Sequence, residues 1–174
     1  MRGAFIILTI LSGLGAGSGC REEVAPETPS KRLEVTTADA QELQERTRDS
    51  EADVVMVHLW ATWCLPCREE FPELVQLADH PQASRFEVIL LSADPAGKEE
   101  QVRSFLQEQN SPWGSLIAES LGEDLFGTLS PDWSGAIPAT FFFDANGKLL
   151  DWWEGARPLD EYDNTIRKLL SDNT

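Results

Sequence analysis

A run of apolar residues that leads directly into two cysteines constrains this chain more than any other feature. The first half of the segment DVVMVHLWATWCLPCREEFP, residues 53–72, is apolar on both alternating faces. This pattern predicts a strand buried in the middle of a sheet. Cys64 and Cys67 follow at once, ahead of helix-forming charged residues. We therefore expect a helix that begins near Cys64 and runs to about His80, kinked by Pro72 one turn past the cysteines.

The rest of the pattern predicts a mixed α/β domain in which parallel strands precede an antiparallel hairpin. A second buried strand, RFEVILLSAD, comes after the helix that contains the cysteines, and a helix between two strands makes them parallel. Thr37 is the expected cap of an earlier helix, and Asn146 and Gly147 turn the hairpin. The expected further elements are a helix over 38–49, a helix over 98–110, an extended segment over 113–118, a short helix over 119–129, a hairpin over 139–155 and a closing helix over 158–170.

The first 20 residues, MRGAFIILTILSGLGAGSGC, have the pattern of an export signal, with Arg2, an apolar run and then small residues. The small residues before Cys20 resemble the lipobox of bacterial lipoproteins, in which the cysteine is lipidated and becomes the new N-terminus. Gly17 stands where lipoboxes usually carry leucine. Cleavage within residues 15–19 and an uncleaved anchor are the alternatives. We expect residues 1–20 to be a lipoprotein-type signal peptide.

The residues after this leader divide into a tether and one domain with an acidic surface. Residues 21–35 are mostly polar, contain prolines and lack apolar periodicity, so we expect a flexible tether. Residues 36–174 are then enough for one domain. The chain has 30 acidic and 14 basic residues and a formal net charge of -16. Such a surface repels nucleic acids and anionic lipid headgroups, so we expect no nucleic-acid partner, while a cationic partner protein remains compatible.

The spacing of the two cysteines in the body of the chain favours redox chemistry. A disulfide that closes so short a loop constrains the unfolded chain very little, so a purely structural bridge explains the pair poorly. Zinc needs four ligands, and beside the CxxC the body offers His58 and His80 and no second CxxC. Free N–H groups and the helix dipole lower the pKa of a cysteine at a helix start. We therefore interpret the pair as a reactive dithiol, with the structural bridge and the metal site as alternatives.

Two motifs connect the chain to a known family. The segment VHLWATWCLPCREEFPEL resembles the active-site segment of the thioredoxin superfamily, specifically its TlpA-like and ResA-like branch of exported, membrane-tethered thiol-disulfide oxidoreductases. The segment GAIPATFFFDANGKL matches the second landmark of that superfamily, a cis proline before a strand and hairpin. The resemblance extends over about Val54 to Leu170. It implies a thioredoxin-like fold, with a central mixed β-sheet flanked by helices and a cis proline opposite a CxxC at a helix N-terminus.

The resemblance also assigns roles to individual residues. Cys64 would be the attacking thiol, Cys67 the resolving thiol, and Trp63 the aromatic ring beside them. Pro138 would be the cis proline that faces the cysteines, and the backbone of Ile137 would pair with an extended substrate segment. The alternative for Pro138 is a simple turn residue.

Glu70 and His58 are the two candidates for proton transfer to or from Cys67. Glu70 falls where this branch places an active-site glutamate, and its spacing from Cys67 points it along the same helix face. Glu69 and Glu70 as exposed charges are the alternative. His58 replaces the aspartate or asparagine usual in relatives, and we favour a core histidine with a satisfied hydrogen bond. We expect Glu70 rather than His58 to handle the proton.

The resemblance implies an extracytoplasmic enzyme without a cofactor other than its own Cys64–Cys67 disulfide. Pro66 between the cysteines resembles the reducing members, so we favour reduction of protein disulfides, with apocytochrome c as the best-known substrate of the branch. An upstream membrane thiol donor would re-reduce the pair. General thiol-disulfide exchange, an oxidase role and a metal-delivery module on the same fold are the alternatives.

Overall fold

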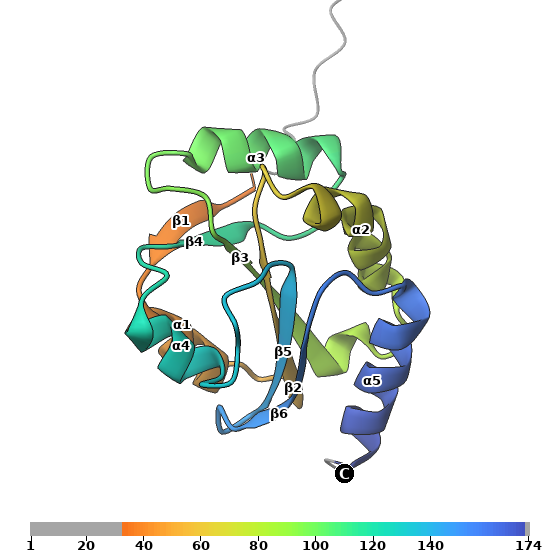
Figure 1. Cartoon of the computed structure of the whole chain (residues 1–174). Helices are drawn as coiled ribbons and strands as arrows, with labels where there is room; N and C mark the ends of the chain where they lie inside the picture. Colours follow the sequence, from red (N-terminus) through yellow and green to blue (C-terminus); the bar gives the residue numbers. More distant parts are fainter. Residues whose placement is uncertain (1–32, 173–174) are drawn as a thin grey trace, which may run out of the picture. The chain divides into compact units, whose positions relative to one another are not determined.

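A mixed β-sheet organises residues 33–172, the part of the chain that this computed structural model describes (Figure 1). Within these residues the sheet has six strands in the order β1-β4-β3-β2-β5-β6. The first four of that order run parallel, and β5 runs antiparallel to both of its neighbours. The strands are β1 (Val35–Ala38), β2 (Val54–Trp60), β3 (Phe86–Ser92), β4 (Ser115–Ala118), β5 (Ala139–Asp144) and β6 (Leu149–Glu154).

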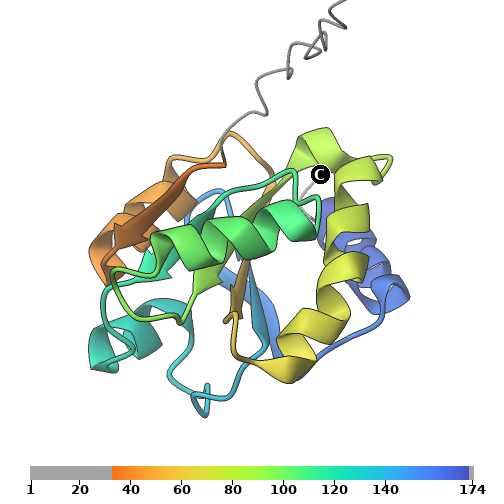
Figure 2. The same cartoon turned by 90° about the horizontal axis from the view of Figure 1, so that it is seen from above.

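Helices cover both faces of the sheet and give the domain three layers. Two helices lie on one face and three on the other, and Figure 2 shows α2 and α5 side by side. On the first face are α1 (Ala40–Arg48) and α4 (Glu123–Leu129), and on the second are α2 (Leu65–Val75), α3 (Glu99–Glu108) and α5 (Leu159–Asp172). The mixed sheet flanked by helices confirms the expected fold class.

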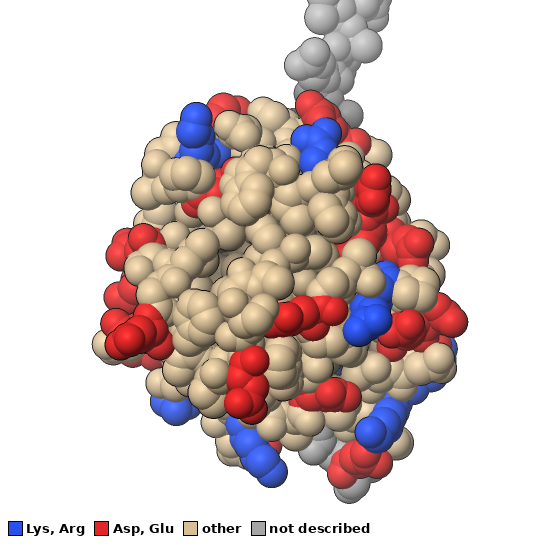
Figure 3. All heavy atoms as spheres, in the orientation of Figure 1, with Lys and Arg blue, Asp and Glu red and all other residues tan. Residues whose placement is uncertain are grey.

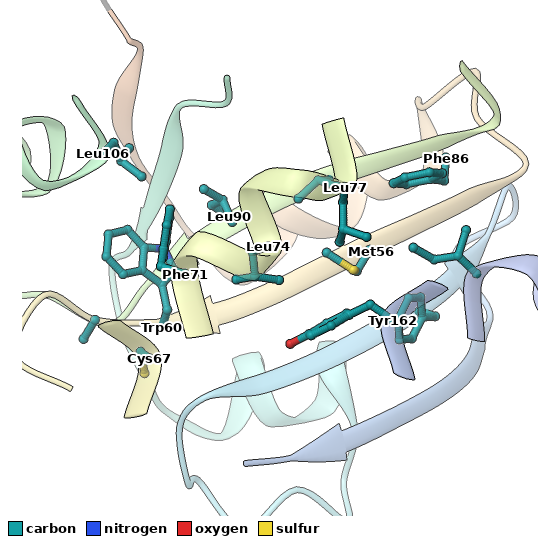
Figure 4. Packing of buried hydrophobic residues seen from close by; sticks show 14 of the residues in the cluster. Met56, Trp60, Cys67, Phe71, Leu74, Leu77, Phe86, Leu90, Leu106 and Tyr162 are labelled. Atoms are coloured by element: carbon teal, nitrogen blue, oxygen red, sulfur yellow. The ribbon is translucent and has the colours of Figure 1, made fainter. Parts of the chain in front are cut away.

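The central strand β2 contributes side chains to both layers of the core. All seven of its residues are buried. Met56 and Trp60 pack under α2, α3 and α5, whereas alternate residues such as Val57 pack under α1 and α4. The Trp60 ring lies 5.0 Å from that of Phe71 and 5.1 Å from that of Phe105. Figure 4 shows Trp60 and Phe71 together in this part of the core. A strand buried on both faces has little tolerance for polar side chains, which makes His58 in its middle an exception.

The start of the domain differs from the expectation. The first helix does not begin after a Thr37 cap, because its N-cap is Asp39, whose side chain accepts the backbone N–H of Glu42 in a capping box. Thr37 instead belongs to β1, which the sequence analysis did not predict and which starts at Val35. This edge strand is short and forms because it pairs in parallel with β4, a contact that no local pattern reveals.

The helix after the cysteines is shorter than expected. It ends at Val75, and residues 76–79 form a 3₁₀ turn, η1 (Gln76–Asp79), so the prediction that it reaches His80 was wrong by its last turn. A second 3₁₀ turn is η2 (Ala83–Arg85). The hairpin turn at Asn146 and Gly147 is confirmed, with Gly147 at a φ of 77° that favours glycine.

The predicted signal peptide, most of the predicted tether and Cys20, the predicted lipidation site, lie outside the described residues. Among the helices of residues 33–172, none combines the length and the apolar character needed to span a membrane.

The capping box yields a stability prediction. Asp39→Ala should lower the free energy of unfolding by about 1 kcal/mol, because the backbone N–H of Glu42 at the start of α1 loses its acceptor. Urea denaturation of the oxidised protein would measure the loss, and Asp39→Asn, which keeps a capping oxygen, should lose much less. Equal effects of both variants would contradict the assignment of the cap.

Candidate active site

The two cysteines form a disulfide at the N-terminus of α2. Cys64 is the N-cap residue, and its Sγ accepts the backbone N–H of Cys67 at 3.3 Å. Cys64 keeps 6% of its surface exposed, whereas Cys67 is fully buried. A nucleophile that attacks a protein substrate must be reachable from outside, so this asymmetry fits Cys64 as the attacking thiol and Cys67 as the resolving thiol.

The second motif lies against the disulfide. The peptide bond between Ile137 and Pro138 is cis, as the resemblance implies, and Pro138 is buried. The Cys64 Sγ lies 3.8 Å from the carbonyl oxygen of Ile137. Two segments more than 70 residues apart in the sequence therefore meet at the reactive sulfur.

Apolar side chains surround the reachable cysteine. Trp63 is 63% exposed and Leu65 is 64% exposed. Such exposure is unusual for two large apolar residues that flank the same cysteine, Cys64. Pro66 is also exposed, in the first turn of α2. Figure 3 shows a broad uncharged area on one face of the molecule, with acidic side chains at its edges. The exposed apolar side chains of Trp63 and Leu65 suit contact with an unfolded or extended protein segment.

A buried carboxylate, which the sequence analysis missed, fixes the loop before the cysteines. Asp94 accepts hydrogen bonds from the backbone N–H of Thr62 at 2.8 Å, from the Thr62 hydroxyl at 2.5 Å and from the Ser92 hydroxyl at 2.7 Å. The side chains of Gln101 and Arg68 donate further hydrogen bonds to Thr62. The sequence contained a signal for this role, because Asp94 is the last residue of the predicted strand RFEVILLSAD, and the carboxyl ends of neighbouring parallel strands meet at the same edge of a sheet.

A second polar group lies in the core between β2, β5, α2 and α5. His58 Nδ1 is 2.9 Å from the Thr140 hydroxyl, which is 3.3 Å from the Tyr162 hydroxyl. Tyr162 donates to Glu70 Oε2 at 3.3 Å, and the backbone N–H of Arg157 donates to the same oxygen at 3.0 Å. Glu70 Oε1 lies 3.1 Å from His58 Nε2, so the side chains of His58, Thr140, Tyr162 and Glu70 form a closed ring of four contacts. All four side chains are buried.

This group shows where the two proton-transfer candidates lie. Glu70 is buried, so its alternative as an exposed charge is wrong, whereas Glu69 is exposed. His58 is a core histidine with a hydrogen bond, as expected. The two residues do not occupy separate places, however, because their side chains contact each other. Tyr162 and Thr140 were not predicted, since nothing in a helix or strand pattern marks which buried hydroxyl meets a distant carboxylate.

Burial also affects the acidity of the tyrosine. Desolvation, and secondly the neighbouring Glu70 carboxylate, raise the pKa of Tyr162 well above its usual range. The hydroxyl therefore keeps its hydrogen at every pH at which the protein functions.

The histidines considered as zinc ligands lie in separate groups. His58 contacts Thr140 and Glu70, whereas His80 accepts the N–H of Gln82 and contacts Asp163 at 2.9 Å. Within residues 33–172, no group of three or more His, Cys, Asp or Glu side chains is arranged to hold a metal ion.

Comparison with known proteins gives consistent results. A family profile described as the AhpC/TSA family matches residues 25–151. The thiol:disulfide interchange protein HelX of Rhodobacter capsulatus is 28% identical over 96% of this chain and 94% of its own length. The thiol-disulfide oxidoreductase ResA of Bacillus cereus is 24% identical over 84% of this chain and 79% of its own.

Among solved structures, a thioredoxin-family thiol:disulfide interchange protein from Chlorobium tepidum is similar, with a TM-score of 0.58 at 22% identity. The match covers 73% of this chain and 84% of that one. At this identity the similarity shows the thioredoxin-like fold.

The buried carboxylate near the cysteines generates a prediction. Asp94→Asn should lower the free energy of unfolding by about 1–3 kcal/mol, because an amide offers one acceptor oxygen to three donors that now face Asp94. Thermal or urea unfolding of the oxidised protein would measure this, with the exposed Asp132→Asn as the matched control. A change no larger than that of the control would show that Asp94 does not hold the loop.

Proposed function

Since this chain belongs to the AhpC/TSA family and is a thiol-disulfide oxidoreductase, we propose that it reduces disulfides of exported proteins through the Cys64–Cys67 dithiol. One observation carries the proposal: a disulfide at a helix N-terminus whose first cysteine is reachable and lies beside a cis proline. Pro66 between the cysteines supports the reducing direction, as in the relatives that the motif resembles.

The geometry supports an ordered reaction. In the reduced protein the Cys64 sulfur is stabilised as a thiolate by the N–H of Cys67 and by the helix N-terminus. This thiolate attacks a substrate disulfide, and one substrate sulfur leaves with the electron pair of the broken bond. Cys67 then attacks Cys64 in the mixed disulfide and releases the second substrate sulfur. Two electrons pass to the substrate, and the Cys64–Cys67 disulfide forms again.

In this proposal a substrate segment binds beside Cys64. The carbonyl of Ile137 lies at the attacking sulfur, so an extended substrate can align its backbone along this segment before β5. Trp63 and Leu65, the exposed neighbours of Cys64 in the sequence, offer apolar contacts. Glu70 accepts the proton that Cys67 gives up, because it lies one turn further along the same helix.

We place this reaction outside the cytoplasm. The N-terminal sequence supports the placement, with an apolar run followed by small residues before Cys20 and then a polar, proline-bearing segment over 21–35. In this proposal residues 1–20 are a lipoprotein signal, Cys20 carries the lipid anchor, and residues 36–174 are the catalytic domain. An apocytochrome c with a cysteine disulfide is the proposed substrate, and a membrane thiol donor supplies the electrons.

The order of attack predicts an asymmetric trap. Cys67→Ser should accumulate a mixed disulfide between Cys64 and the natural substrate, because the resolving thiol is missing. Cys64→Ser, the matched control, should capture nothing. Non-reducing electrophoresis with mass spectrometry of the trapped species would identify the substrate, and equal capture by both variants would contradict the assigned roles.

Lipidation predicts a defined mature chain. Intact-mass analysis of membrane-extracted protein should find a chain that starts at Cys20 with added acyl mass. Cys20→Ala should reduce the membrane-bound fraction. Several acyl chains are expected, since one alone binds a membrane weakly. A mature chain that starts elsewhere and carries no lipid would refute the anchor.

A further inference from the structure

Two buried atoms in the core face each other without a second partner. His58 Nε2 and Glu70 Oε1 lie 3.1 Å apart, and within the described chain neither has any other hydrogen-bond partner. A lone pair that faces a second lone pair at this distance, away from water, is costly. A hydrogen must therefore lie between these two atoms.

When all four contacts are hydrogen bonds, their directions make this hydrogen an additional one. Tyr162 uses its only hydrogen on Glu70 Oε2, so Thr140 must donate to the Tyr162 hydroxyl. The Thr140 hydroxyl can then only accept from His58, whose Nδ1 must carry a hydrogen. A neutral histidine has one ring hydrogen, which Nδ1 now holds. The contact between His58 Nε2 and Glu70 Oε1 therefore needs one additional hydrogen.

The same result comes from counting, whichever way the hydrogen bonds run. For each of the four contacts in the ring to be a hydrogen bond, the ring needs four hydrogens. Threonine, tyrosine and neutral histidine bring one each, and an ionised glutamate brings none. The fourth is a dissociable proton, which the ring holds in addition to the hydrogens of a neutral His58 and an ionised Glu70.

The titratable side chains that form this ring or lie near it belong to β2, α2 and α5. Glu70 lies on α2 and Tyr162 on α5, while the strands contribute His58 and the neutral Thr140. From the segment before α5, the backbone N–H of Arg157 stabilises Glu70. Cys67 lies on α2 one turn before Glu70, and Figure 4 shows the Tyr162 hydroxyl pointing to the side of the core on which Cys67 lies.

We propose that this ring stores one proton between His58 and Glu70 in the oxidised protein and transfers it to Cys67 when the disulfide is reduced. The proposal rests on the proposed function and extends it. It makes His58 a partner of Glu70 in proton transfer, with Tyr162 and Thr140 as positioning residues.

The transfer fits a balanced cycle. A thiolate of a donor dithiol attacks Cys64, the Cys64–Cys67 bond breaks, and its electron pair stays on the Cys67 sulfur, which takes the stored proton. The second donor thiolate then frees Cys64 as a thiolate and forms the donor disulfide. When Cys67 later resolves the mixed disulfide with substrate, its proton returns to the ring. Both substrate sulfurs leave as thiolates, one at each step, and take their protons from the solvent.

The ring makes a prediction about a residue distant from the sulfurs. Thr140→Val removes one hydroxyl and leaves two contacts, from His58 to Glu70 and from Tyr162 to Glu70. Neutral histidine and tyrosine supply both hydrogens, so the opened ring needs no stored proton. Valine has nearly the shape of threonine and suits a strand, so the fold should tolerate the change.

Proton uptake from solution during reduction tests the transfer. The oxidised mature protein is reduced anaerobically in weak buffer with a pH indicator, using the same phosphine reductant throughout so that its own protons cancel. Thr140→Val should take up about one proton more per disulfide than the wild type, because Cys67 must then draw on water. Thr47→Val, which removes a buried hydroxyl hydrogen-bonded to Leu43 in α1, is the matched control and should behave as the wild type.

Nitrogen NMR of the His58 ring provides a second measurement that does not depend on turnover. In the oxidised wild type Nδ1 should be protonated, and in Thr140→Val the hydrogen should move to Nε2 opposite Glu70. Equal proton uptake in both proteins, or an unprotonated Nδ1 in the wild type, would overturn the stored proton. Failure of the Cys67→Ser trap would instead overturn the proposed function, so the two failures can be told apart.

Discussion

The pairing of β2 with β5 is the interaction on which the rest of the site depends. It places His58 directly opposite Thr140 in the antiparallel register, with both side chains toward α2 and α5. It also brings the segment that precedes β5, with its cis peptide at Pro138, to the end of β2 from which Cys64 follows. One backbone ladder therefore sets the position of the reactive sulfur relative to its substrate-binding segment and of the two partners in the buried ring.

The contact between α2 and α5 completes this arrangement. Glu70 and Glu73, one turn apart on α2, accept the backbone N–H groups of Arg157 and Leu159, at and just before the start of α5. Carboxylates at a helix N-terminus satisfy donors that have no partner within the helix. The same contacts bring Tyr162 to Glu70. The proposed catalytic carboxylate thus also joins two helices, which accounts for its burial.

Much of the fold could be predicted because its signals are local. The apolar runs of β2 and β3, the hairpin turn and the CxxC before a helix are patterns within short segments. The predictions that failed at the start of the domain depend on contacts between distant segments: β1 exists because of β4, and the cap of α1 moved from Thr37 to Asp39 because Thr37 was already part of that strand. The cysteines and Pro138 followed from motifs. The link between His58 and Glu70 did not, since the strand pattern says only that position 58 is buried and not which side chain faces it.

The β2–β5 register makes the site sensitive to a particular kind of sequence change. Side chains along a strand alternate between faces, so adding or removing a single residue within β5 would turn Thr140 toward α1 and α4 and place Ala139 or Phe141 opposite His58. A substitution at one position alters one hydrogen bond, whereas a shift in length dismantles the ring and moves Pro138 relative to Cys64. Single residues of β5 can therefore be substituted one at a time, whereas its length must be kept because it sets which residues face His58 and Cys64.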